Sequence, residues 1–247
     1  MRLALIADIH ANREALEAVL EHARRVGCER HVFLGDLVGY GADPQWVVAC
    51  VQSFVARGAI AVKGNHDVGV AGSVSPHMVG AARDAVAWTR AQLGPRELRF
   101  LQDLPLTHSQ GEMLFVHANA FAPAQWEYVL GRAEAARSMR ATQSIYTFCG
   151  HVHQPCLYHQ SAAAHCMDFV PTSDMPVPVA AHRRWLVLPG SAGQPRDGNP
   201  AACYASFDAA RRVLTFHRVA YDHDAAAAKI RAVGLPATLA TRLAHGQ

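Results

Sequence analysis

The sequence predicts an α/β fold in which short strands alternate with amphipathic helices. Continuously apolar runs of strand length recur through the first third of the chain, and such runs are typical of strands covered on both faces. Between them, apolar residues recur at i, i+3, i+4 and i+7, which is the pattern of a helix with one buried stripe. Right-handed crossovers would make these strands parallel neighbours in one sheet.

The first third of the chain is expected to form three strands and two helices. Asn12 is a suitable N-cap for the first helix, and Asp43 with Pro44 marks the start of the second, because proline favours the first helical position. The expected order is a strand over residues 3–7, a helix over 12–27, a strand over 31–34, a helix over 43–58 and a strand over 59–62.

The rest of the chain continues the alternation and adds antiparallel hairpins. Gln110 and Gly111 form a turn signal between two apolar runs. The expected elements are a helix from Ser75-Pro76 to about Gly94, a helix over 96–102, a hairpin of 104–108 with 112–116, a helical stretch over 126–140, a strand over 145–149, strands over 157–159 and 185–188 flanking an irregular loop over 165–182, a hairpin of 203–207 with 213–219, and helices over 224–233 and 236–243. Residues 1–247 are expected to form a single domain, with approximately 222–247 as appended C-terminal helices.

Composition narrows the class of protein. The chain has 247 residues, 51% of them hydrophobic, and no apolar run reaches the roughly 18–20 residues of a membrane span. The net charge is +3 and the basic residues are scattered, so neither a nucleic acid nor a membrane is expected as a partner. Six cysteines without a Cys-x-x-Cys spacing are interpreted as reduced thiols of a cytoplasmic protein. The oligomeric state stays open.

Polar side chains follow the expected strands at the positions where ligands bind in parallel sheets, beyond the carboxyl ends. The pattern is Asp-x-His, Gly-Asp, Gly-Asn-His-Asp, a lone His and Gly-His-x-His. These residues are Asp8, His10, Asp36, Asn65, His66, Asp67, His117, His151 and His153. Each motif alone is weak evidence for a functional site. A turn with a solvated histidine, or a core histidine that bonds to the backbone, could have the same sequence.

The chemistry of this set favours metal binding. Carboxylate, imidazole and amide-oxygen ligands together suit divalent ions such as Mn, Fe, Ni or Zn, and they do not suit a thiolate site. Seven ligands are too many for one tetrahedral ion, whereas two ions that share a carboxylate would use them all.

Taken in order from Asp8 to His153, these motifs resemble the calcineurin-like metallophosphoesterase family. The string Pro-Gly-Ser-Ala-Gly-Gln-Pro-Arg-Asp-Gly at 189–198, with Tyr221 and Asp222, is similar to the small bacterial and archaeal phosphodiesterase branch. The resemblance implies a four-layer αββα sandwich of two mixed sheets flanked by helices. It also implies a phosphoesterase whose substrate is a small phosphoester.

The resemblance further implies a role for each motif residue. It assigns Asp8, His10 and His153 to one ion, Asn65, His117 and His151 to the other, and Asp36 to both. His66 would protonate the leaving group after a metal-bridging hydroxide attacks phosphorus, and Asp67 would hold the His66 ring. Manganese or iron is the expected metal, with zinc, nickel or magnesium as alternatives.

One departure from the family pattern bears on the substrate. Protein phosphatases and diadenosine tetraphosphatases place arginine where this chain has Tyr40, and tyrosine cannot clamp a monoester dianion with two hydrogen bonds. A phosphodiester is therefore expected, with a monoester or a dinucleoside polyphosphate as the alternative and a non-catalytic binding scaffold as a remote one. Tyr40, Arg196 and Asn12 are the expected substrate neighbours. Arg196 could equally hold its loop, and Asn12 is foremost an N-cap.

Overall fold

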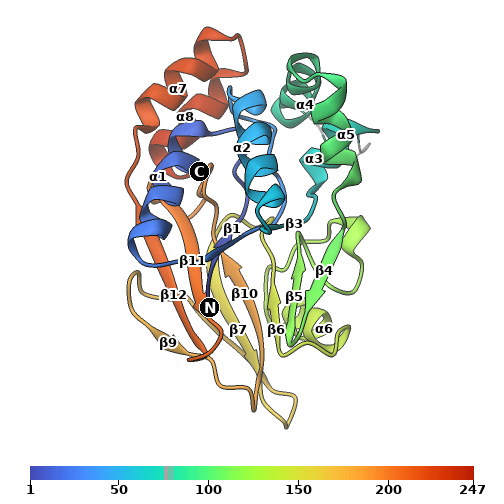
Figure 1. The fold of residues 1–247 in the computed structure, drawn as a ribbon, viewed down its shortest axis with the longest axis vertical. Coiled ribbons are helices and arrows are strands. Elements are labelled where there is room, and N and C mark those ends of the chain that lie inside the picture. Colours follow the sequence, from blue (N-terminus) through green and yellow to red (C-terminus); the bar gives the residue numbers. More distant parts are fainter. Residues whose placement is uncertain (75–77, 79) are drawn as a thin grey trace.

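The computed structural model describes residues 1–74, 78 and 80–247, and these residues form two mixed sheets of six strands each (Figure 1). The strands are β1 (Arg2–Ile6), β2 (Arg30–Phe33), β3 (Ile60–Ala61), β4 (Thr107–Gln110), β5 (Met113–Val116), β6 (Tyr146–Phe148), β7 (Pro155–Gln160), β8 (Cys166–Phe169), β9 (Val177–Pro178), β10 (Arg184–Pro189), β11 (Ala202–Asp208) and β12 (Val213–Val219). One sheet has the order β3-β2-β1-β11-β12-β9 and the other β4-β5-β6-β10-β7-β8.

Helices cover the outer faces of both sheets. They are α1 (Arg13–Arg25), α2 (Pro44–Ala56), α3 (Asn65–Ala71), α4 (Ala81–Gln92), α5 (Pro95–Asp103), α6 (Arg132–Arg140), α7 (His223–Ala232) and α8 (Ala237–His245). Helices α1 and α2 pack on the sheet that contains β1, and α6 packs on the sheet that contains β10. The C-terminal helices α7 and α8 pack on each other, and α7 contacts α1 (Figure 1). The predicted α/β class and four-layer arrangement are confirmed.

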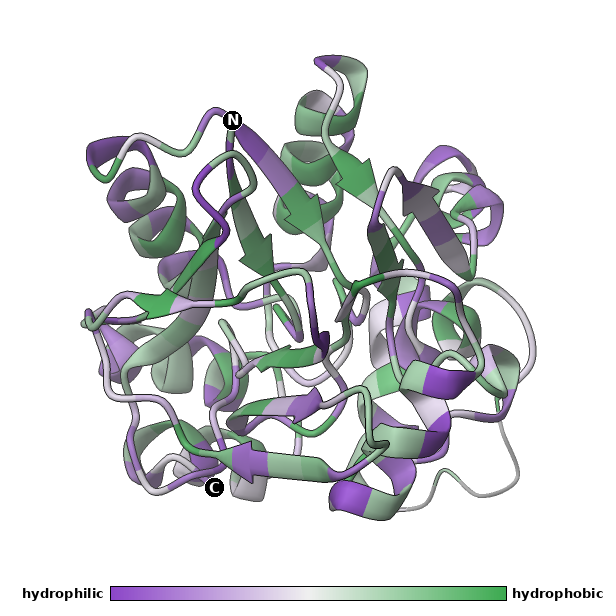
Figure 2. Cartoon of the chain, turned by 90° about the horizontal axis from the view of Figure 1, so that it is seen from below, coloured by the Kyte–Doolittle hydropathy of each residue, from purple (hydrophilic) through white to green (hydrophobic). Residues whose placement is uncertain are grey.

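The alternation of side chains along β1 shows how the layers are joined. Leu3, Leu5 and Ala7 lie in the core between the two sheets, whereas Ala4 and Ile6 face the helices. All five are buried, which explains the unbroken apolar run, because this strand is covered on both faces. Figure 2 shows mostly hydrophobic strands at the centre and, around them, helices in which hydrophobic and hydrophilic residues alternate.

Most expected elements are present, and three differ. The stretch expected as a helix over 126–140 is helical only from Arg132, because Trp126 adopts a left-handed conformation (φ 59°) that a helix cannot contain. The loop expected over 165–182 contains two short strands, β8 and β9. Asp43 precedes α2 as expected but makes no capping hydrogen bond, because its carboxylate accepts from Lys229 at 2.8 Å.

Two further points concern what the structure describes. The expected helix start at Ser75-Pro76 lies outside the described residues, and α4 is described from Ala81. Among the helices in the described part of the chain, none combines the length and the apolarity that crossing a bilayer requires.

Leu5→Ala tests the core between the sheets. Leu5 is fully buried, so its truncation leaves a cavity, and we expect the free energy of unfolding to fall by about 2–5 kcal/mol in urea titration. Leu130→Ala is the control, because it removes the same atoms from a side chain that is 72% exposed. This substitution should change the free energy of unfolding by less than about 0.5 kcal/mol. Equal effects of the two substitutions would contradict the inter-sheet core.

Candidate metal centre

The loops that follow β1, β2, β5 and β6 bring their polar side chains together. Three groups have ligand atoms that lie within 4.8 Å of one another among the described residues. They are Asp8 with His10 and His153, His10 with Asp36 and His66, and Asp36 with His117 and His151. All of these side chains are buried, and an isolated buried polar group is costly, so the cluster needs compensation from within.

The first histidine pair contains a hydrogen-bonding conflict. His10 Nδ1 lies 3.3 Å from Val38 O, and His153 Nδ1 lies 2.7 Å from Gln194 O. A carbonyl only accepts, so each Nδ1 carries the proton and each Nε2 presents a lone pair. The two Nε2 atoms nevertheless lie 3.1 Å apart. Two facing lone pairs repel, and a cation that both can ligate resolves the conflict.

The second pair repeats this arrangement with different atoms. His117 Nδ1 faces Leu34 O at 2.8 Å, and His151 Nε2 faces Trp126 O at 2.9 Å. The remaining nitrogens, Nε2 of His117 and Nδ1 of His151, are 3.1 Å apart. Carbonyl groups that fix the second ring nitrogen are typical of histidine ligands to metals. The donor set therefore fits a divalent cation at each pair.

Asp36 lies between the two pairs. Its Oδ2 atom is 3.7 Å from His10 Nε2 and 3.4 Å from His117 Nε2, and its Oδ1 accepts from the backbone of His66 at 2.8 Å. Although burial alone would raise the pKa of Asp36, the surrounding imidazoles of His117, His66 and His10 hold it well below its usual value. An ionised carboxylate in this position can serve both cation sites.

Protonation in the cluster is set mainly by burial. Burial lowers the pKa of His10, His66 and His153, and it lowers the pKa of His151 to about 3, so these rings are neutral, the form that ligates metals. His117 differs, because the adjacent Asp36 outweighs burial and raises its pKa to about 9. Without a metal, its Nε2 can therefore carry a proton and donate to His151 Nδ1, and a bound cation would replace that proton.

The pKa of Asp8 is shifted in the direction opposite to that of Asp36. Burial raises the pKa of Asp8 to about 7, even though His117 acts in the other direction. The carboxylate is also surrounded closely, because a Cβ atom on Gly150 would clash with its Oδ2. A buried carboxylate of this kind is stabilised in its charged form by an adjacent cation.

The backbone and the carboxylate of Asp8 together connect the loop after β1 to the loops after β2, β10 and β6. Its N–H donates to Gly35 O at 3.1 Å, and its carbonyl accepts from Gly193 N at 3.0 Å and from Ser191 Oγ at 2.8 Å. Its carboxylate accepts from His151 N at 3.0 and 3.1 Å. The loop after β10 is therefore part of the centre, although none of its residues was expected as a ligand.

Strained backbone marks the ligands. A left-handed conformation is uncommon for residues other than glycine and tends to occur at functional sites. Five of the expected metal ligands adopt it: Asp8 (φ 54°), His10 (φ 50°), Asp36 (φ 50°), His151 (φ 70°) and His153 (φ 64°). Asn65 is the first residue of α3, and its Oδ1 lies 3.2 Å from His117 Nε2.

His66 and Asp67 are both buried, but they do not make the contact that we expected. Asp67 Oδ1 accepts from the N–H groups of Leu37 and Val38 at 2.9 and 3.2 Å, and Oδ2 accepts from Gly64 N at 2.9 Å. In the described part of the chain, His66 Nδ1 has no hydrogen-bond partner. The expectation that Asp67 holds the His66 ring is therefore wrong, because backbone donors occupy both oxygens.

The conformation of Tyr40 and its neighbour shapes the space around His66. The Tyr40 ring lies 4.4 Å from the His66 ring and 4.5 Å from that of His10, measured between centroids. Gly39 precedes it with φ 88°, and a Cβ there would clash with His66 Nδ1. Arg196 lies with its guanidinium carbon 5.9 Å from the Tyr40 ring centroid.

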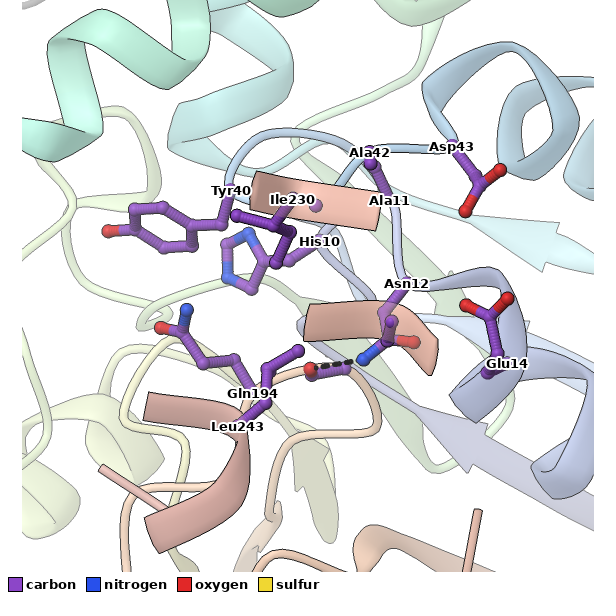
Figure 3. A pocket seen from close by; sticks show the side chains of 13 residues that line it. His10, Ala11, Asn12, Glu14, Tyr40, Ala42, Asp43, Gln194, Ile230 and Leu243 are labelled. Carbon is purple, nitrogen blue, oxygen red and sulfur yellow. Dashed lines mark hydrogen bonds between the residues drawn. The ribbon is translucent and has the colours of Figure 1, made fainter. Parts of the chain in front are cut away.

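Arg196 and Asn12 have distinct surroundings. Arg196 Nη2 donates to Gln194 Oε1 at 3.0 Å, whereas its buried Nε meets no acceptor in the described residues 1–74, 78 and 80–247. Asn12 caps α1 as predicted, accepting from Ala15 N at 3.1 Å, and its amide donates to Gly193 O at 2.8 Å (Figure 3). Arg196 is thus the better placed of the two to bind an anion.

A narrow pocket adjoins His10 (Figure 3). It lies between Tyr40, Gln194 and the C-terminal helices, from which Ile230 and Leu243 enter it. Its volume of about 10 Å³ is room for roughly one water molecule, so the pocket is not a substrate chamber in this conformation.

Three residues near the centre were not expected as ligands, catalytic groups or substrate neighbours. Gln194 positions both Arg196 and His153, Trp126 accepts from His151, and the Tyr128 ring stacks on His151 at 4.0 Å between centroids. A Gly/Pro-rich loop was the only signal for Gln194. Trp126 and Tyr128 had none, because the stretch that contains them was expected to be helical.

Comparisons with known proteins agree with this geometry. A family model described as the calcineurin-like phosphoesterase superfamily domain matches residues 1–212. An uncharacterized protein of Methanocaldococcus jannaschii is 33% identical over 252 residues, covering 99% of this chain and 98% of its own. The crystal structure of a metallophosphoesterase from Sphaerobacter thermophilus is 37% identical, covers 100% of this chain and 99% of its own, and has a TM-score of 0.89. A hypothetical protein from Pyrococcus horikoshii shares the fold, with 21% identity, coverage of 100% and 98%, and a TM-score of 0.79.

Asp67→Asn tests the backbone role of this residue. An amide nitrogen cannot accept, so at least one of the three N–H donors would lose its partner, and we expect a loss of about 1–3 kcal/mol in the free energy of unfolding. The measurement is urea unfolding in the presence of a chelator, with the exposed Asp103→Asn as control. Unchanged stability together with lost activity would instead indicate a role in orienting a catalytic group.

Proposed function

The chain belongs to the calcineurin-like phosphoesterase superfamily, whose members hydrolyse phosphoesters with divalent metals, and we propose that it is a phosphodiesterase with a two-metal centre. The observation that carries the proposal is the repeated close approach of two ring nitrogens, 3.1 Å apart, at His10 with His153 and at His117 with His151. Each pair calls for one cation, and Asp36 lies between them.

In this proposal each half of the centre has its own ligands. Asp8, His10 and His153 hold one ion, Asn65, His117 and His151 hold the other, and Asp36 is shared. When bound, such ions activate water as a nucleophile and neutralise charge on phosphoryl oxygens. The chain itself keeps the imidazole rings in place through carbonyl groups, so little reorganisation is needed when the substrate arrives.

His66 is proposed as the proton donor to the leaving alkoxide. Its ring lies 4.9 Å from that of His10 and 4.4 Å from that of Tyr40, beside the ligands, and Nδ1 has no hydrogen-bond partner among the residues that the structure describes. An anionic substrate beside the ring would favour the protonated form and oppose the effect of burial. The alternative, that His66 ligates a metal with His10 and Asp36, is distinguishable by metal content.

Tyr40 and Arg196 are proposed to bind the phosphoryl oxygens and so to select the substrate by its charge. One guanidinium and one hydroxyl near the ligands match the single negative charge of a diester. The two charges of a monoester are bound better by arginines that make two parallel hydrogen bonds. Burial raises the pKa of Tyr40, so the hydroxyl is a donor at neutral pH. Manganese or iron is the proposed metal, and the substrate is a small phosphoester.

Metal content separates ligands from the proton donor. Wild-type protein stripped with a chelator and reloaded with Mn²⁺ should hold about two ions per chain, measured by plasma mass spectrometry. Asp36→Ala should hold fewer, because it removes the shared carboxylate. His66→Ala should retain about two, and a loss of metal from this variant would make His66 a ligand.

A substrate panel tests the reaction. With Mn²⁺, we expect a higher kcat/KM on an aryl phosphodiester than on an aryl phosphomonoester or diadenosine tetraphosphate. His66→Ala should lower kcat by roughly 10²–10⁴-fold, the usual contribution of a general acid. A preference for the monoester or the tetraphosphate would replace the diester proposal, and inactivity with every metal would indicate a binding scaffold.

Tyr40→Phe tests the hydroxyl alone. We expect kcat/KM on the diester to fall roughly fivefold to tenfold, in line with one hydrogen bond of about 1–1.5 kcal/mol, while metal content is unchanged. Tyr146→Phe is the control, because its hydroxyl donates to Val179 O at 2.8 Å, away from the ligands. No effect of Tyr40→Phe would remove this hydroxyl from substrate binding.

A further inference from the structure

A second cluster of polar side chains lies apart from the metal ligands, on the sheet that contains β1. Ser206 Oγ is 2.9 Å from His217 Nε2, and His217 Nδ1 is 2.7 Å from Asp174 Oδ1. Ser206 pairs with Ala4, four residues before Asp8, which places it roughly 13 Å along the strand from the metal centre. No sequence motif marks these three residues, which lie far apart along the chain.

Strand pairing produces this cluster. In the antiparallel pair of β11 and β12, Tyr204 lies opposite His217, and Ser206 is the diagonal neighbour on the same face. The Tyr204 ring stacks on His217 with centroids 4.8 Å apart and an interplanar angle of 30°. His22 of α1 covers both, and its Nδ1 lies 2.8 Å from the Tyr204 hydroxyl. The imidazole is thus held on two sides.

Asp174 comes from the loop between β8 and β9. It is one of the described non-glycine residues in a left-handed conformation (φ 61°), and its N–H donates to Phe216 O at 2.7 Å. The backbone is therefore anchored in a conformation that turns the carboxylate toward His217. The loop over 165–182, whose role the sequence left open, supplies this residue.

The partners fix the tautomer of His217. The side chain of Asp174 is 66% exposed, and its Oδ1 faces the ring as an acceptor. His217 Nδ1 therefore carries the proton and Nε2 presents a lone pair to the Ser206 hydroxyl, which donates. Burial lowers the pKa of His217, although Asp174 acts in the other direction, so the ring is neutral and able to accept a proton.

A cleft of about 210 Å³ opens beside these groups. Ser206 and His217 line it together with the apolar side chains of Val26 and Val213 and the cationic side chains of Arg2 and Arg211. A volume of this size admits a small molecule such as a short-chain ester. Asp208 also lines the cleft, and its Oδ2 lies 3.8 Å from Arg2 Nη2, so the charge of Arg2 is paired within the cleft wall.

We propose that Ser206, His217 and Asp174 form a serine nucleophile site that hydrolyses small carboxylic esters without a metal. The order of contacts, from hydroxyl to imidazole to carboxylate, matches the roles of nucleophile, general base and positioning residue. The site is independent of the proposed phosphodiesterase centre and does not rest on it.

The reaction balances with water as the only co-reactant. Ser206 Oγ bonds to the ester carbonyl carbon while its proton passes to His217 Nε2. The carbon–alkoxide bond then breaks, and the leaving alkoxide takes that proton and departs as an alcohol. Water, deprotonated by His217, then attacks the acyl carbon. The carbon–Oγ bond breaks, His217 returns the proton to Ser206 Oγ, and the carboxylic acid is released.

The test uses the full-length protein treated with a chelator. A fluorophosphonate probe should form a covalent adduct on Ser206, located by peptide mass spectrometry, and p-nitrophenyl acetate should be hydrolysed with multiple turnovers. Ser206→Ala should abolish both signals, and His217→Asn should slow both by roughly 10²-fold or more. Ser53→Ala, a serine on α2, is the matched control and should behave as wild type.

Asp174→Asn separates positioning from mere folding, because the side chain is exposed and its loss leaves the core intact. His217 faces Asp174 from the β8–β9 loop, His22 from α1, Arg2 from β1 and Tyr204 from β11. Asp174 raises the pKa of His217, so the substitution should shift the midpoint of the labelling-rate profile to lower pH and reduce the plateau rate roughly tenfold or more.

Several results would overturn the proposal. One is the absence of an adduct on Ser206 in folded wild-type protein at pH 8, and another is an adduct without ester turnover. A third is labelling of His217→Asn or Asp174→Asn at the wild-type rate, with folding verified by circular dichroism. Any of these outcomes would reduce the cluster to a hydrogen-bonded element of the sheet.

Discussion

The backbone and side chain of Asp8 join the two sheets, and the geometry of the metal centre depends on this junction. Asp8 bonds to Gly35 after β2, to Ser191 and Gly193 after β10, and to His151 after β6. A buried backbone or carboxylate group without a partner costs about 1–3 kcal/mol, so these bonds lock the loops against one another. Ligands from distant parts of the sequence are thereby brought to one point before any substrate binds.

Histidine rings in this protein owe their chemistry to the group that fixes the second ring nitrogen. In the metal centre, backbone carbonyls take one N–H from each ring, and the free lone pairs of neighbouring rings point at each other, as for His10 with His153. At His217 a carboxylate takes the N–H, and the lone pair points at a hydroxyl instead. The first arrangement calls for a cation, whereas the second activates a nucleophile.

The sequence was most informative where local physical rules apply. Apolar runs located the central strands because both of their faces are covered, and Asn12 was recognised as an N-cap because this motif needs only neighbouring residues. The sequence was misleading where a group distant along the chain takes the hydrogen bond that a local motif predicts. Asp43 binds Lys229 instead of capping α2, and Asp67 accepts from Leu37 and other backbone donors instead of holding His66.

By itself, the sequence determined the α/β class and the set of polar residues beyond the strand ends. The periodicity of strands and helices and the spacing of motifs can be recognised directly in the order of the residues. The tertiary structure alone decided which ring nitrogens face each other, since the second nitrogen of each ring is fixed by a carbonyl from another loop. It also decided that Ser206, His217 and Asp174 meet. Their contact follows from the register of β11 with β12 and from the path of a loop, neither of which leaves a periodic signal in the sequence.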